Sequence, residues 1–127
     1  MQLNYLNKPY FGNGSLDNLP KIIEYLNLKS PLICTDPGLS AIGMTDKIID
    51  LISNETSISL YQETPANPNE QAVNDALSLY RSNECDSVIG FGGGSSMDLA
   101  KAVALMANHE GNVRDYSVNE GGIKKIK

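Results

Sequence analysis

The segment from Asp86 to Lys101 constrains the fold of this chain more than any other. It places a short apolar run, residues 87–91, directly before three glycines at 92–94, and a helix-forming pattern follows. Glycine has no Cβ, so it adopts positive φ and lets another group approach the backbone closely. A helix start presents unpaired N–H groups and the positive end of the helix dipole. The order predicts a site for an anionic group such as the pyrophosphate of a nucleotide, with a turn that binds nothing as the alternative.

Strand and helix patterns alternate along the whole chain. Apolar residues spaced three or four apart predict helices within 16–26, 42–52, 73–80 and 99–106, with Ser15 as a candidate N-cap and Pro20 in a first turn. Short apolar runs predict strands at 31–35, 58–61 and 87–91, and a further strand ending at 10–12. This alternation predicts one α/β domain over residues 1–127, with a parallel sheet covered by helices on both faces.

The acidic balance of the chain excludes some classes of partner. The net charge is −5 at pH 7 and the sequence pI is about 4.7. Binding to nucleic acid or to an anionic membrane needs a basic face, so we expect neither. No apolar run approaches the ~18 residues of a membrane helix, and residues 1–5 lack the basic and apolar regions of a signal peptide. We therefore expect a cytoplasmic protein.

Cysteine and histidine are too few for several kinds of chemistry. Cys34 and Cys85 form neither a disulfide framework nor a zinc motif, and Cys34 lies in an apolar run where a buried thiol behaves as a small hydrophobe. A cysteine nucleophile needs a base nearby, and His109 lies beyond the last predicted helix. We expect no cysteine nucleophile, and we expect His109 to be an exposed helix-end residue that interacts with the dipole.

Three conspicuous segments follow predicted strands, at residues 36–38, 65–68 and 92–95. In an open parallel sheet, ligands bind beyond the carboxyl ends of the strands. In an ordinary dinucleotide-binding fold the glycine turn comes first and an acidic residue follows about 20 residues later. Here Asp36 precedes Gly92 by 56 residues. A plain glycine-rich fingerprint therefore does not describe this chain.

The motifs resemble the iron-containing (group III) alcohol dehydrogenase family over essentially the whole chain. They are Gly92-Gly93-Gly94-Ser95 with Asp98 and Lys101, Gly12-Asn13-Gly14-Ser15-Leu16, Leu19-Pro20, Thr35-Asp36-Pro37-Gly38 and Pro65-Ala66-Asn67-Pro68. The resemblance implies a Rossmann-like fold of the kind seen in the N-terminal domain of dehydroquinate synthase. Family members are much longer, and a helical metal-binding domain follows the part that this chain resembles.

The resemblance also implies roles for acidic and amide side chains. Asp36 can accept hydrogen bonds from both hydroxyls of the adenosine ribose and would repel a 2′-phosphate, which favours NAD over NADP. The alternative is that Asp36 caps the turn before Pro37. Asn67 is implied as a further cofactor contact. The alternative is that Asn67 only serves the conformation of its loop. Asp98 faces the cofactor pocket in the family, although its position also suits helix-start capping.

The glycine turn is implied to hold the pyrophosphate. Gly92 belongs to this turn, and Gly93, Gly94 and Ser95 would offer N–H groups and a hydroxyl to the phosphate oxygens. Lys101 lies one turn after Asp98, so an intrahelical ion pair or a solvated side chain is the alternative to a role in the site.

The resemblance thus identifies an N-terminal NAD-binding domain, present as a fragment, a split product or an isolated domain, with no catalytic residue or metal ligand of its own. The complete enzyme would use iron or zinc and transfer hydride between an alcohol and NAD, giving an aldehyde or ketone. This chain alone would be inactive, and it would associate with a C-terminal domain or with itself through exposed apolar surface. Two alternatives stay open: a relative of glycerol dehydrogenase or dehydroquinate synthase, the former disfavoured by Ser95, and a non-catalytic nucleotide-binding or interaction module.

Overall fold

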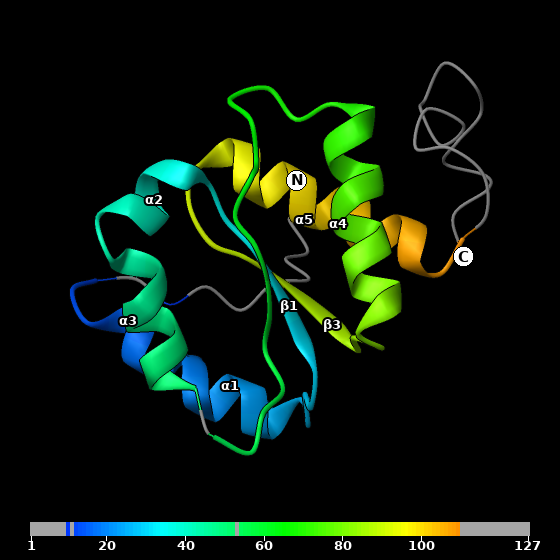
Figure 1. Cartoon of the computed structure of the whole chain (residues 1–127). Coiled ribbons are helices and arrows are strands. Elements are labelled where there is room, and N and C mark those ends of the chain that lie inside the picture. The colour runs from blue at the N-terminus through cyan, green and yellow to red at the C-terminus, as the bar shows by residue number, and fades with distance from the viewer. Residues whose placement is uncertain (1–9, 11, 53, 110–127) are drawn as a thin grey trace, which may run out of the picture.

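The computed structural model describes residues 10, 12–52 and 54–109. Its elements alternate along the chain as strand and helix (Figure 1). In chain order they are the 3-10 helix η1 (Ser15–Asn18), α1 (Leu19–Tyr25), β1 (Pro31–Cys34), α2 (Pro37–Ala41), α3 (Met44–Leu51), β2 (Ser59–Tyr61), α4 (Glu70–Ser82), β3 (Ser87–Gly90) and α5 (Gly94–Ala107).

The three described strands form a parallel sheet in the order β2-β1-β3. In the middle strand, Leu32 is in register with Ser59 on one side and with Val88 on the other. Every residue of β1 is buried, which explains why its sequence is a continuous apolar run rather than an alternating one.

Helices cover both faces of the sheet, as the sequence predicts. On one face, Leu32 and Cys34 pack with the buried residues of α4 and α5. On the other face, Ile33 packs with Ile23 of α1 and Ile48 of α3. Figure 1 shows α4 and α5 on one side of β1 and α1, α2 and α3 on the other. The period of two in a strand sends neighbouring side chains to opposite faces, so a single strand supports two apolar clusters.

Three local predictions need correction. The sequence pattern does not predict α2, and the helix expected within 42–52 is α3, which begins only after Gly43 with φ 81°. Ser15 does not cap α1, because its hydroxyl donates to the Gly12 carbonyl at 2.7 Å and α1 begins only at Leu19. Of the strand expected to end at 10–12, residue 11 lies outside the described residues and the other two are not in a strand. Pro20 does lie in the first turn of α1.

Asp86 ties the amino ends of β1 and β3 together. Its carboxylate accepts hydrogen bonds from the Lys29 N–H at 2.7 Å, the Ser30 N–H at 3.0 Å and the Ser87 hydroxyl at 2.9 Å. Partial desolvation opposes ionisation, but these hydrogen bonds outweigh it and lower the pKa of Asp86. The clamp fixes where β1 begins, at the opposite end of the sheet from the glycine turn.

Within the part of the chain that the structure describes, no helix combines the length and apolar character that crossing a membrane requires.

Candidate functional site at the carboxyl edge of the sheet

The three segments that follow β1, β2 and β3 meet at one edge of the sheet. Figure 1 shows the start of α5 and the loop before α4 at the same end as α2. The Thr64 N–H donates to the Thr35 carbonyl at 3.3 Å, which joins the loop after β2 to the end of β1. The Ser95 hydroxyl donates to the Ala66 carbonyl, which joins the same loop to the first turn of α5. The sequence prediction that these segments share an edge is therefore confirmed by the fold.

Asp36 serves as a helix cap and also lies beside the glycine turn. It is the N-cap of α2, and its Oδ1 accepts a hydrogen bond from the Leu39 N–H at 2.9 Å. Its Oδ2 is 3.1 Å from the point that a Cβ on Gly92 would occupy. Described residues donate no hydrogen bond to Oδ2. The capping role and a role in ligand binding are thus compatible, because each uses a different oxygen.

Gly92 differs from the two glycines that follow it. Its φ is +141°, and a Cβ there would also lie 3.0 Å from Ser96 Oγ. In contrast, a Cβ on Gly93 or Gly94 would have nothing within 4 Å. Gly93 is the N-cap of α5 and has no side chain, so no side-chain cap covers the first N–H groups of this 14-residue helix. The arrangement is an open backbone site for an anion at a helix N-terminus.

Buried hydroxyls without partners are a feature of the edge that the sequence interpretation missed. Thr35, Thr64 and Ser96 are at most 3% exposed, and their hydroxyl oxygens have no hydrogen-bond partner among the described residues. Buried polar side chains are ordinarily paired, so such atoms need an explanation. One signal for Ser96 was present in the sequence, because it precedes Leu99, Ala100 and Val103 at helical spacing and so falls on the apolar stripe of α5.

Asn67, Asp98 and Lys101 are exposed at or near this edge. Asp98 does not cap α5, since no side-chain hydrogen bond caps the helix. No described residue forms a hydrogen bond or ion pair with the side chain of Asn67, Asp98 or Lys101. The structure therefore brings Asp36 and the glycine turn together directly, whereas it places Asn67 and Asp98 nearby without fixing what they contact.

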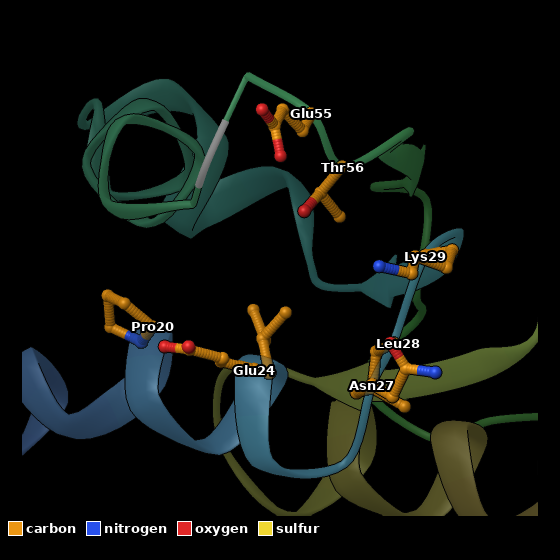
Figure 2. Close-up of a pocket in the computed structure, with 8 residues that line it drawn as sticks. Pro20, Glu24, Asn27, Leu28, Lys29, Glu55 and Thr56 are labelled. Atoms are coloured by element: carbon orange, nitrogen blue, oxygen red, sulfur yellow. The ribbon is translucent and has the colours of Figure 1, made fainter.

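A cavity of about 330 Å³ lies away from this edge (Figure 2). Residues of α1, the turn after it and the loop after α3 line it, with Glu24, Lys29 and Glu55 as the charged members. Lys29 lies two residues before the first residue of β1, so the cavity is at the end of the sheet opposite to the glycine turn. The two sites share no residue.

The described residues do not fit a metal ion, because no three His, Cys, Asp or Glu side chains among them gather closely enough to hold one. His109 follows α5, and its Nδ1 donates to the Leu105 carbonyl at 2.6 Å, which gives it a role at the helix end. It is half-buried rather than exposed. Burial, with a smaller contribution from Cys85, raises the pKa of the Cys34 thiol to about 12, so this cysteine is not a nucleophile at neutral pH.

Comparison with known proteins identifies the family. The "4-hydroxybutyrate dehydrogenase" of Cupriavidus necator is 37% identical over 122 residues, which cover 96% of this chain and 32% of that protein. "Alcohol dehydrogenase 4" of Schizosaccharomyces pombe is 37% identical over 107 residues, which cover 84% of this chain and 25% of that protein. The fold matches that of sulfoacetaldehyde reductase from Bifidobacterium kashiwanohense in complex with NAD+, with a TM-score of 0.75, 27% identity and coverage of 83% of this chain and 28% of that one.

The chain thus spans about a quarter to a third of the length of these relatives. The family described as iron-containing alcohol dehydrogenase matches residues 7–127. The match covers most of the chain and agrees with the resemblance seen in its motifs. The chain belongs to the iron-containing alcohol dehydrogenase family, of whose members it corresponds to the N-terminal part.

Proposed function

We propose that this chain binds NAD at the carboxyl edge of its sheet, as the nucleotide-binding part of an alcohol dehydrogenase. One observation carries the proposal: the Oδ2 of Asp36 lies beside Gly92, at the uncapped N-terminus of α5. A helix N-terminus that can bind an anion then lies next to a carboxylate. The first suits the pyrophosphate of a dinucleotide and the second suits the hydroxyls of its ribose. The NAD+ in the structure of the sulfoacetaldehyde reductase supports the same choice of ligand.

The pyrophosphate would be held mainly by backbone N–H groups. Gly93 and Gly94 leave open space where a side chain would be, so phosphate oxygens can approach the first turn of α5. The Ser95 hydroxyl has one proton, and that proton is already donated to the Ala66 carbonyl. Ser95 therefore offers its N–H to the phosphate, and its hydroxyl holds the neighbouring loop, with Asn67, against the helix.

The ribose of the adenosine would meet Asp36. A carboxylate accepts hydrogen bonds from a pair of hydroxyls but repels a 2′-phosphate, so the site favours NAD over NADP. Asn67 and Asp98, both exposed near this edge, are proposed as further contacts of the cofactor. When bound, NAD supplies the ring that takes up a hydride.

The test is a calorimetric titration of the folded chain with NAD and with NADP. We expect NAD to bind more tightly than NADP, and Asp36→Asn to reduce that preference because it removes the charge and keeps an oxygen that can cap α2. Asp36→Gly is the companion variant, since glycine is also an acceptable N-cap and removes both interactions with ribose. Equal affinities for the two nucleotides in the unmodified chain would contradict the role of Asp36.

The reaction of the complete protein belongs to the same proposal. We infer hydride transfer between a small alcohol and NAD, giving an aldehyde or ketone, with iron or zinc held by residues outside the described part of the chain. The names of the relatives, a 4-hydroxybutyrate dehydrogenase and an alcohol dehydrogenase, support this chemistry. The chain alone is expected to be inactive and to associate with a C-terminal domain, and Met97, 46% exposed in the first turn of α5, supports such a contact. Metal-dependent oxidation of short alcohols by the purified chain would contradict this expectation.

A further inference from the structure

Ser96 is buried in the first turn of α5 without a hydrogen-bond partner. Its side chain is 1% exposed, and no described residue pairs with its Oγ. A serine inside a helix commonly bonds back to the carbonyl four residues earlier, and Ser96 does not. Burying an unpaired hydroxyl opposes folding, so alanine at this position would serve the stability of the free chain better. The hydroxyl therefore points to a function that the free chain does not use.

The surroundings of Ser96 show what that hydroxyl faces. Ser96 Oγ lies 3.0 Å from the point where a Cβ on Gly92 would be, and Asp36 Oδ2 lies 3.1 Å from the same point. The two oxygens are thus separated by at most two hydrogen-bond lengths. One can donate and the other, as a carboxylate, accepts. Because Gly92 has no side chain, nothing of its own fills the space between them.

We propose that Ser96 is a positioning residue that orients the Asp36 carboxylate for the ribose of the cofactor. Its hydroxyl donates to Oδ2, either directly after a small rotation or through one bridging water. The Leu39 N–H already holds Oδ1, so a second hydrogen bond fixes the plane of the carboxylate. The glycine turn then has a second role, because any side chain at Gly92 would separate Ser96 from Asp36. The inference rests on the proposed NAD site.

The experiment measures NAD and NADP affinity by calorimetry, and the melting temperature, for the unmodified chain and for Ser96→Ala. We expect Ser96→Ala to raise the melting temperature of the free chain, because an unpaired buried hydroxyl is removed. We expect NAD affinity to fall about three- to tenfold, with a smaller preference for NAD over NADP. A purely structural role for Ser96 would not change that preference.

A double-mutant cycle shows whether Ser96 acts through Asp36. In the Asp36→Asn background, Ser96→Ala should have little further effect on the ratio of NAD to NADP affinity. Thr45→Val is the matched control, because it also deletes a buried hydroxyl, but one that pairs with Ser40 at 3.0 Å. The control should lower the melting temperature and leave the ratio unchanged.

The outcomes separate this inference from the proposed function. If the unmodified chain binds no NAD, the proposed function fails and the role of Ser96 fails with it. If NAD binds and Ser96→Ala keeps the same affinity and the same preference, the role of Ser96 alone is overturned. The role of Ser96 would also be overturned if Ser96→Ala changed the ratio of NAD to NADP affinity equally in the unmodified chain and in the Asp36→Asn background.

Discussion

Gly92 and Gly93 are adjacent in the chain but differ in backbone conformation and in the space around them. Gly92 has φ +141°, in the region that side chains rarely adopt, whereas Gly93 is extended, with φ −79° and ψ −167°. The three atoms nearest to a Cβ on Gly92 belong to side chains, which can shift slightly, but the backbone conformation cannot be relieved in the same way. The backbone of the free chain therefore requires glycine at 92, whereas at 93 only the proposed ligand would require it.

This difference predicts opposite results for two alanine substitutions. Gly92→Ala should lower the free energy of unfolding by about 1–3 kcal/mol, because alanine is strained at this φ. Gly93→Ala should change it by less than about 1 kcal/mol, because the position is open and its conformation is ordinary. Urea denaturation of both variants provides the measurement, and an equal loss in the two would contradict the assignment of strain to Gly92.

At the scale of elements, different contacts hold the two ends of the sheet. The amino end of β1 is held by the carboxylate of Asp86, and the carboxyl end by the segments that meet around Asp36. Because hydrogen bonds to Asp86 lower its pKa in the folded chain, the ionised form stabilises the fold. This contribution is complete above the unfolded value of 3.8 and is lost as the pH falls through the lowered folded value.

We therefore expect Asp86→Asn to lower the free energy of unfolding at neutral pH. We also expect it to make that free energy less dependent on pH below about 4. The amide of asparagine cannot accept two N–H hydrogen bonds and one hydroxyl hydrogen bond as a carboxylate does. Urea midpoints measured for both proteins at neutral pH and near pH 3 isolate this residue from the other carboxyl groups. If the urea midpoint fell by the same amount between neutral pH and pH 3 in both proteins, the carboxylate of Asp86 would make no contribution to the pH dependence of stability.

Most elements could be predicted from the sequence because their apolar spacing coincides with their burial. Residues 31–34 are apolar throughout and form the central strand, and the pattern of α4 places Val73, Ala76 and Leu77 in the core. The five-residue helix α2 was missed because none of its residues is buried, so it has no apolar stripe, and Gly43 with a φ of 81° separates it from α3.

The candidate site could be predicted only in part. Parallel strands all end at one edge, so the order of the chain is enough to bring Asp36 and the glycine turn together. The position of Ser96 Oγ near Gly92 depends on how α5 is rotated about its axis, which is set by packing on the sheet. Apolar spacing indicated the buried stripe of α5, but it could not show which atoms its polar member faces.

At the scale of the whole molecule, the described residues form a three-stranded sheet between two apolar clusters, and its carboxyl edge carries the open glycine turn. The chain matches the N-terminal part of much longer family members, and binding of the cofactor is the function that we propose for its residues. The central claim is that the glycine turn is built to receive a pyrophosphate rather than only to reverse the chain.

The most direct measurement is NAD affinity in the unmodified chain and in Gly93→Val, with the melting temperature of each as a control for folding. A valine at 93 meets nothing within 4 Å of its Cβ in the free chain, so the variant should fold normally. The valine would fill the space over the first turn of α5, and we predict at least a tenfold (~1.4 kcal/mol) loss of NAD affinity. A folded Gly93→Val chain that binds NAD as tightly as the unmodified chain would contradict the account and leave the glycines as a turn.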